Sequence, residues 1–497
     1  MQGIQHVNPY LKPLKSSLAE KPALSSLILI VLMYLGFVFS KIDLSITIAL
    51  SVLPVVLILV FRIVIEPEFG LTFAYVINFF LMGIPRYIPM DIGYYMDGLL
   101  LLIYISFFFK YFYFKVDWSP VKNDLFYLMS FWLIYICLQV LNPEAVSFQA
   151  WMAAMRSLAL YPFLIMPLIF MLYNKPKHLD RFILIWGIIS SLASLKGIGQ
   201  LVFGLDSYEQ AWMNSGAYKT HILFGQLRVF SFYTDAGQFG AAQAHVALIA
   251  ILLTINAPNQ KSRILWLTIA ILNLWGYAIS GTRGALAVIM AGAALYIILS
   301  KNVKVIVIGA SVLFLLYGFL KFTTIGNGNY QINRIRTGLS SDDPSLQLRL
   351  QNQRTLAAYL ESRPFGAGVG HSGSKARKFI PYSYLATIAT DSWYVIIWAE
   401  LGVVGLMIHF FVMFYILGKG MYIVMFKIKN KDLKVKLDAL LCGYFGILTA
   451  NYGNAVINQF PTWLMLYSSL AFIWLGPSLD KILENEKRSQ KELNSSL

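Results

Sequence analysis

Five arginines are candidates for binding an anion. Arg283 interrupts the apolar stretch YAISGTRGALAVIM (277–290), and Arg228 lies in GQLRVFSFYTDAGQFG (225–240). The segment NRIRTGLSSDDPSLQLRL (333–350) adds Arg334, Arg336 and Arg349. Charge is costly to remove from water, so an arginine kept among apolar residues calls for a functional reason. Because the planar guanidinium group makes bidentate contacts with phosphate, these residues indicate a phosphate or diphosphate site.

Two further residues could accept a proton. Asp391 begins DSWYVIIWAELGVVGLMI (391–408), and His371 lies in the glycine-rich GAGVGHSG (366–373). Either side chain could act as a general base if its pKa and its position suit the reaction. The structural alternative for Asp391 is to cap the N-terminus of the helix that follows. The glycine-rich stretch follows no predicted strand, which argues against a nucleotide-binding loop.

The elements that position these residues are predicted to be transmembrane helices. Of the 497 residues, 58% are hydrophobic and 13% are charged, which is about half the charged fraction of soluble domains. Apolar runs recur along the chain without the alternation of outer-membrane barrels, so we expect an all-α polytopic membrane protein with about 12–14 transmembrane helices. The spans are expected near 24–41, 44–65, 70–86, 96–114, 123–142, 155–173, 180–203, 237–257, 263–281, 283–300, 303–321, 391–417, 436–452 and 459–477.

Basic residues predict the orientation and the organisation of the chain. Lys12, Lys15 and Lys21 precede the first span, and alternate turns are rich in Lys and Arg, which indicates a cytoplasmic N-terminus. The net charge of +16 then reflects cytoplasmic turns rather than nucleic-acid binding. The prediction is a cytoplasmic N-terminal segment (1–23), transmembrane helices 1–11 (24–321) with an outer loop (204–236), a large periplasmic loop that forms an ordered cap (322–390), transmembrane helices 12–14 (391–477) and a cytoplasmic tail (478–497).

Other features of the sequence argue against disulfide bonds and metal sites. Cys137 and Cys442 both lie in apolar runs, so they provide neither a disulfide framework nor metal-ligand spacing. The polar N-terminal segment does not have the features of a signal peptide. Asp342 and Asp343 precede Pro344 and are more simply explained by a turn than by a cation site. We expect no metal and no cofactor.

The predicted orientation places Arg283 at the outer face, at the start of the tenth span. Thr282 is the predicted N-cap of that helix, and a helix N-terminus combines unpaired N–H groups with a positive dipole end. Because the other four arginines lie in the two outer loops, all five guanidinium groups could converge on one multivalent anion. The alternatives are an interfacial Arg283 that reaches toward the headgroups and solvated charges in the loops.

These motifs resemble those of the superfamily of O-antigen ligases and Wzy-type O-antigen polymerases. Asp391 and Ser392, followed by nine residues and G-x-x-G, are similar to the outer-loop motif, in which the ligases have a histidine at the position of Asp391. ESRPFGAGVGHSG (361–373) resembles the hPl-G-x-G element, and SGTRGAL (280–286) resembles the S-x-(T/S)-R-G turn. LRVFSFYTDAGQFG (227–240) resembles R-x-x-G-x-x-x-N-x-x-x-x-G, with Asp235 near the Asn position. The elements follow the order of the family over residues 220–415.

The resemblance implies a GT-C-type membrane glycosyltransferase in the bacterial inner membrane, with its active site facing the periplasm. Such enzymes transfer an oligosaccharide from undecaprenyl diphosphate to a sugar hydroxyl with inversion and without a metal. The two arginines of the family carry over onto Arg228 and Arg283 as diphosphate-binding residues. The implied partners are a lipid-linked oligosaccharide donor and acceptor, the lipid bilayer and a chain-length regulator protein, with no nucleic acid.

Three functions remain open at this point. Asp391 in place of the ligase histidine favours a polymerase of O-antigen, capsule or exopolysaccharide repeat units. A ligase that transfers the glycan to lipid A core or to protein is the alternative enzyme. A flippase or transporter for the same lipid is an alternative of another class, but transporters place polar groups and broken helices at mid-membrane. In this chain, polar residues concentrate at one face, beneath a long loop.

Overall fold

The computed structural model describes residues 44–88, 94–112, 115–223, 225–328, 330–338, 340 and 343–495, together with positions 26, 30, 31, 33 and 34. The predicted N-terminal segment 1–23 and most of the predicted span 24–41 lie outside the described residues. The described chain is mostly helical, with one short pair of strands, which confirms the all-α class. It forms two compact units, one of Met1–Leu71 with Leu101–Lys115 and the other of Thr72–Leu100 with Val116–Leu497.

The smaller unit contains α3 (Leu44–Ile65), the first turn of α4 (Pro67–Phe80) and the C-terminal part of α5 (Tyr95–Tyr111). The Ser106 hydroxyl donates a hydrogen bond to the carbonyl oxygen of Ile63 at 2.6 Å. Gly70 packs against the side chains of Ile63 and Ile103. Small residues let helices approach closely in a bilayer, where packing replaces the hydrophobic effect.

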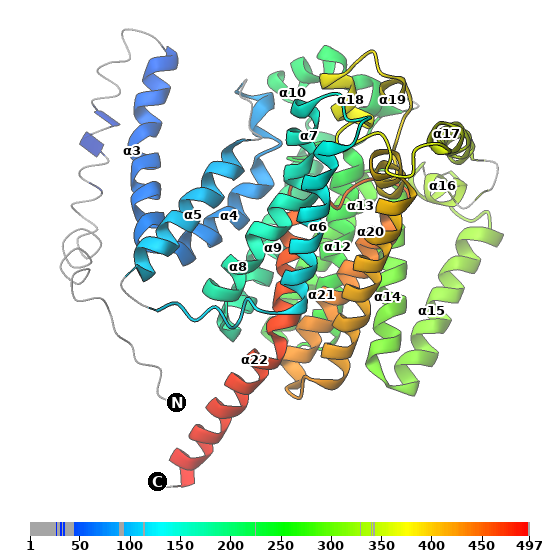
Figure 1. Cartoon of the computed structure of the whole chain (residues 1–497). Helices are drawn as coiled ribbons and strands as arrows, with labels where there is room; N and C mark the ends of the chain where they lie inside the picture. Colours follow the sequence, from blue (N-terminus) through cyan, green and yellow to red (C-terminus); the bar gives the residue numbers. More distant parts are fainter. Residues whose placement is uncertain are drawn as a thin grey trace. The chain divides into compact units, whose positions relative to one another are not determined.

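The larger unit contains a bundle of long helices with short helices over one end (Figure 1). The long helices and the segments that continue them are α6 (Asp124–Leu138), η3 (Gln139–Leu141), α7 (Phe148–Met155), the π-helix η4 (Arg156–Leu160), α8 (Tyr161–Leu172), α9 (Pro176–Val202), α12 (Ala236–Ile255), α13 (Gln260–Ile279), η6 (Arg283–Ala285), α14 (Leu286–Ser300), α15 (Val303–Phe322), α20 (Trp393–Phe426), α21 (Lys431–Ala450) and α22 (Thr462–Ser495).

Among the described residues, nine helical segments are long and apolar enough to cross a membrane, which confirms a polytopic membrane protein. They are Asp124–Leu141, Phe148–Leu172, Pro176–Val202, Ala236–Ile255, Gln260–Ile279, Arg283–Ser300, Val303–Phe322, Trp393–Phe426 and Thr462–Ser495. Four other predicted spans also coincide with helices, namely α3, α4, α5 and α21. α22 continues to Ser495 as one helix, so the predicted tail 478–497 is helical over most of its length.

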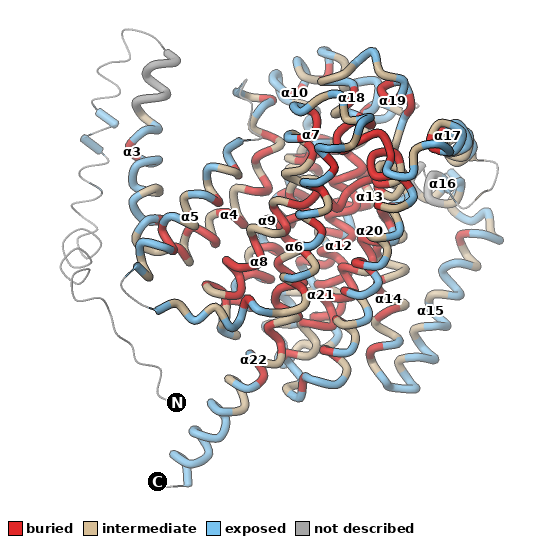
Figure 2. Tube along the Cα trace, in the orientation of Figure 1, coloured by how far each residue is buried: buried red, intermediate tan, exposed pale blue. Residues whose placement is uncertain are grey.

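α12 is the buried centre of this bundle. It packs against α9, α13, α14 and α21, and 83% of its apolar window is buried, against 6% for α15 (Figure 2). Its Gln243 side chain is paired at both ends: it accepts a hydrogen bond from the Ser194 hydroxyl at 2.9 Å and donates one to the Tyr233 hydroxyl at 3.2 Å. Gly240 packs against Ser280 and Thr282, so the C-terminal end of α13 lies directly on α12.

The two long loops that are predicted to lie on the outer side contain short regular elements. Loop 204–236 contains α10 (Ser207–Trp212), η5 (Met213–Ala217), α11 (Tyr218–His221) and the antiparallel pair β1 (Ile222–Leu223) and β2 (Gln226–Leu227), in which Ile222 pairs with Leu227. Loop 322–390 contains α16 (Tyr330–Thr337), α17 (Pro344–Leu360), α18 (Gly373–Phe379) and α19 (Tyr384–Thr387).

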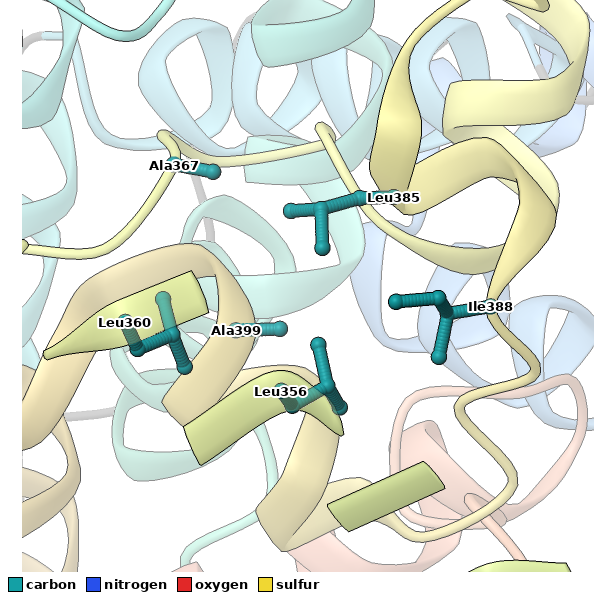
Figure 3. Close-up of a cluster of buried hydrophobic side chains, with 6 residues drawn as sticks. All are labelled: Leu356, Leu360, Ala367, Leu385, Ile388 and Ala399. Carbon is teal, nitrogen blue, oxygen red and sulfur yellow. The ribbon is translucent and has the colours of Figure 1, made fainter. Parts of the chain in front are cut away.

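The loop 322–390 packs on α20 through its own hydrophobic cluster. Leu356 and Leu360 of α17 meet Leu385, Ile388 and Ala367 around Ala399 of α20 (Figure 3). Burial of such side chains stabilises the contact by roughly 1.5–3 kcal/mol for each large one. The loop residues that follow α17 are therefore held in a fixed position against α20.

Candidate functional site

Arg283 lies where α13 ends and α14 begins, and it binds a carboxylate of the loop 322–390. Its Nη1 and Nη2 donate to the two carboxylate oxygens of Asp343, at 2.5 and 3.2 Å. Asp343 also caps α17, because its side chain accepts a hydrogen bond from the Leu346 N–H at 2.9 Å. Burial raises the pKa of Asp343, but the hydrogen bonds from Arg283 and Leu346 outweigh it and lower the pKa below its ordinary value. The pair therefore joins α14 to α17 as an ionised, bidentate contact.

Arg228 reaches the same turn from the loop 204–236. It follows β2, and its Nη2 donates to the Thr282 hydroxyl at 3.2 Å while its Nη1 donates to the carbonyl oxygen of Thr220 at 3.3 Å. Thr282 occupies the N-cap position of η6, as predicted, but its hydroxyl makes no capping bond and donates to the Ala236 carbonyl oxygen at 2.8 Å. Two segments that are far apart in the sequence, and that each carry an arginine, thus meet at Thr282.

Arg349 and Asp391 form the third part of the site. Arg349 lies on α17, and its Nη2 donates to the carbonyl oxygen of Gly453 at 3.0 Å. Its Nε lies 3.8 Å from Oδ2 of Asp391, whose side chain is 58% exposed. The N-cap of α20 is Ser392 rather than Asp391, so the structural alternative for this aspartate is wrong. Its carboxylate is accessible to a substrate beside a guanidinium group.

His371 is buried with both ring nitrogens occupied by backbone groups. Its Nε2 accepts a hydrogen bond from the Ser147 N–H at 3.1 Å, and its Nδ1 lies 3.0 Å from the Val369 carbonyl oxygen. Because Nε2 is the acceptor, Nδ1 must carry the proton and donate it to Val369. Burial lowers the pKa of His371. The neutral ring holds the loop to the N-terminus of α7 and presents no lone pair to a substrate.

Arg336 is bound to oxygen atoms at and just beyond the end of α15. Its guanidinium group donates to the carbonyl oxygens of Leu320 and Ile325, at 3.0 and 3.1 Å, and to the side chain of Asn327. These contacts satisfy groups at the C-terminal end of α15, where a helix leaves carbonyls unpaired. The backbone of Arg334 belongs to α16, but its side chain lies outside the described residues.

A joint at Gly402 connects α20 to residues 364–368 of the loop, and sequence reasoning recognised its two motifs but not the contact between them. Gly402 has a φ of +67° inside α20 and lies against Pro364 and Gly366. Ala367 and Gly368 donate backbone hydrogen bonds to the carbonyl oxygens of Ala399 and Glu400, at 3.0 and 2.9 Å. The G-x-x-G and hPl-G-x-G elements are therefore two halves of one contact. The Ser372 hydroxyl adds a hydrogen bond to the Glu400 carboxylate at 2.9 Å.

The arrangement suits an anionic, oxygen-rich substrate. Arg228 binds Thr282, which directly precedes Arg283 in the 280–283 turn. Arg283 binds Asp343 at the N-terminus of α17, the helix that carries Arg349. Asp391 lies beside Arg349. Fixed cations of this kind can stabilise negative charge that develops on a leaving group. No group of three or more His, Cys, Asp or Glu side chains suited to a metal ion occurs in the described part of the chain.

Comparisons with known proteins agree with this geometry. The family model described as O-Antigen ligase matches residues 268–410, which include Arg283, Arg349, His371 and Asp391. An O-antigen polymerase of Salmonella muenchen is 25% identical over 306 residues, which are 59% of this chain and 74% of that protein. The resemblance inferred from the motifs is thus confirmed: the chain is similar to the superfamily of O-antigen ligases and Wzy-type polymerases, and both comparisons support a membrane enzyme of the glycosyltransferase type.

Proposed function

We propose that the protein polymerises oligosaccharide repeat units carried on undecaprenyl diphosphate, at the periplasmic face of the inner membrane, with inversion and without a metal. The observation that carries the proposal is the meeting of the Arg228 and Arg283 segments at Thr282, beneath a loop that also supplies Arg349. The same outer end holds Asp391 beside Arg349. A diphosphate and a reacting sugar hydroxyl could therefore occupy neighbouring positions.

In this mechanism, the diphosphate of the donor lies against Arg228 and Arg283. The acceptor hydroxyl oxygen forms a bond to the anomeric carbon from the face opposite the diphosphate, and the bond between that carbon and the diphosphate oxygen breaks. The electron pair leaves with the lipid diphosphate, whose added charge the arginines stabilise. The hydroxyl proton passes to the Asp391 carboxylate. Arg283 must share its guanidinium group between the diphosphate and Asp343, or exchange one for the other.

The transfer of a glycan to lipid A core or to protein is a second candidate. It is favoured by the family model described as O-Antigen ligase, which covers the Arg283, Arg349 and Asp391 segments. The O-antigen polymerase of Salmonella muenchen matches a larger part of the chain, over 306 residues. We favour the polymerase because the position of the ligase histidine is occupied by Asp391.

A reconstituted reaction distinguishes these functions. Purified protein in lipid nanodiscs receives an undecaprenyl-diphosphate-linked repeat unit in the presence of a chelator, and the products are separated by size. A ladder of repeat units supports the polymerase. Transfer only after lipid A core is added supports the ligase. Movement of the lipid-linked unit across vesicles without a new glycosidic bond, or a strict requirement for a divalent ion, would overturn the proposal.

A further inference from the structure

A second group of cations lies on other elements of the larger unit. Arg156 begins the π-helix η4, and its Nη1 donates to Oδ2 of Asp97 on α5 at 2.6 Å. Its guanidinium carbon also lies 4.6 Å from the centre of the Tyr94 ring. π-Helical turns are rare and are frequently found at functional sites. Arg156 is thus held, by an ion pair and an aromatic face, at the N-terminal end of α5.

Lys375 of α18 adds a positive charge near Arg156 that is not compensated by an ion pair. No carboxylate oxygen in the described part of the chain lies within 4.0 Å of its ammonium group, although the side chain is partly buried. Burial lowers the pKa of Lys375 first, and the charges of Arg156 and Lys378 lower it further; the Glu400 charge opposes them without outweighing them. A bound anion would relieve both the burial and the repulsion.

An apolar groove lies next to Arg156, because Tyr95 and Met96 line it and their sequence neighbours Tyr94 and Asp97 contact Arg156. It lies between α4 and the first turns of α5, has a volume of about 270 Å³, and is lined by residues that include Ile77, Leu81, Tyr95, Met96 and Leu99. Asp97, which binds Arg156, adjoins Met96 in the same turn of α5. The groove therefore combines an apolar trough with a cationic end, which matches a hydrocarbon chain attached to an anionic headgroup.

We propose that this groove binds the second lipid-linked substrate, with its polyprenyl chain against α4 and α5 and its diphosphate between Arg156 and Lys375. The inference rests on the proposed function, because a polymerase must hold two lipid-diphosphate oligosaccharides at once. Two cations from separate segments match the charge of a diphosphate better than they match the single negative charge of a phosphodiester lipid. Arg228 and Arg283 then hold the donor, and Arg156 and Lys375 hold the acceptor.

The first test separates the two substrates kinetically. The donor is a lipid-linked unit blocked at its acceptor hydroxyl, and the acceptor is an unblocked, labelled unit at varied concentration. Lys375→Gln and Arg156→Gln should each raise the KM for the acceptor at least fivefold and leave the KM for the donor unchanged. The matched control is Arg377→Gln, an exposed residue of the same short helix, which should change neither KM. An unchanged acceptor KM in both variants, or an equal rise for both substrates, would overturn the proposal.

The second test does not depend on turnover. In an Arg228→Ala, Arg283→Ala background, undecaprenyl diphosphate should still raise the unfolding temperature, and Lys375→Gln should remove most of that rise. Lys375→Gln without ligand should unfold no earlier than its parent, since it relieves repulsion, so a loss of binding would not reflect misfolding. Phosphatidylglycerol should give a smaller rise that Lys375→Gln does not change. An equal, Lys375-dependent rise with phosphatidylglycerol would identify an ordinary phospholipid site instead. If the wild type formed no ladders, the proposed polymerase function would be wrong. The binding measurement would still show whether undecaprenyl diphosphate binds at Arg156 and Lys375.

Discussion

Asp391 and His371 differ in what surrounds the atoms that would accept a proton. The Asp391 carboxylate is more than half exposed and has one weak contact with Arg349. The His371 ring is buried, and its acceptor nitrogen is already bound by the Ser147 N–H. We therefore propose Asp391 as the base and a structural role for His371.

Substitution of these two residues should separate the roles. Asp391→Asn keeps the size of the side chain but cannot accept the proton, so kcat should fall by about 100-fold or more. His371→Gln should destabilise the protein by about 1–3 kcal/mol, because it disturbs a buried hydrogen-bonded pair, while folded enzyme keeps a kcat near that of the wild type. Rates of ladder formation and thermal unfolding provide both measurements. A fully active Asp391→Asn would remove the need for this base.

At the scale of elements, the joint between α20 and residues 364–368 depends on Gly402. A Cβ at this position would collide with the Pro364 carbonyl group, and the φ of +67° is strained for any other residue. Gly402→Ala should therefore cost more than about 2 kcal/mol from left-handed strain and overpacking together. Gly418→Ala in the same helix is the control, because open space surrounds its Cβ position. Equal thermal stability of the two variants would show that the joint is not rigid.

The contact between α14 and α17 should depend on pH. The pKa of Asp343 is lowered in the folded protein, so the stability that it contributes is fully present above its ordinary value of 3.8 and is lost as the pH falls through the lower, folded value. Asp343→Asn keeps a good N-cap but removes the ion pair, and should cost about 2 kcal/mol at neutral pH. Unfolding followed from neutral pH to about pH 3 should show the difference between variant and wild type shrinking toward zero. A difference that is constant with pH would exclude the ion pair as its source.

For the whole molecule, the apolar runs were sufficient to predict where most helices lie. Backbone groups in hydrocarbon must pair within a helix, so each long apolar run between 44 and 477 became helical. The span predicted at 155–173 begins earlier, at Phe148, because Ser147 caps it and its first turn is less apolar. Hydropathy alone cannot detect such an interfacial turn.

The candidate site was only partly predictable. The outer segments of Arg228 and Arg283 were expected to meet, but the sequence did not show that Asp343, 60 residues beyond Arg283, would bind it. Nor did it show that Arg336 would satisfy the carbonyl groups at the end of α15 instead of joining the other arginines. Both outcomes depend on which polar groups remain unpaired after the helices pack, and one sequence does not contain that information.

The proposed orientation predicts which surfaces can be labelled from outside the cell. With Cys137 replaced by Ser, cysteines are introduced at Tyr382, which is fully exposed near α19, and at Lys429, which is 78% exposed in the turn between α20 and α21. A membrane-impermeant maleimide added to spheroplasts should label position 382 and not position 429. The reverse pattern would place the arginine site on the cytoplasmic side and contradict the proposed mechanism.

The most direct test of the central claim is the binding of undecaprenyl diphosphate to four forms of the protein: the wild type, Arg228→Ala, Arg283→Ala and the double variant. Calorimetric titration is carried out in each case with Lys375→Gln as the common background, so that only the first site is measured. If both guanidinium groups bind one diphosphate, each single variant should raise Kd by about tenfold or more, and the two effects should be coupled by at least about 0.5 kcal/mol. Arg354→Ala, an exposed change on α17, should leave Kd unchanged. An unchanged Kd in both single variants would contradict the account.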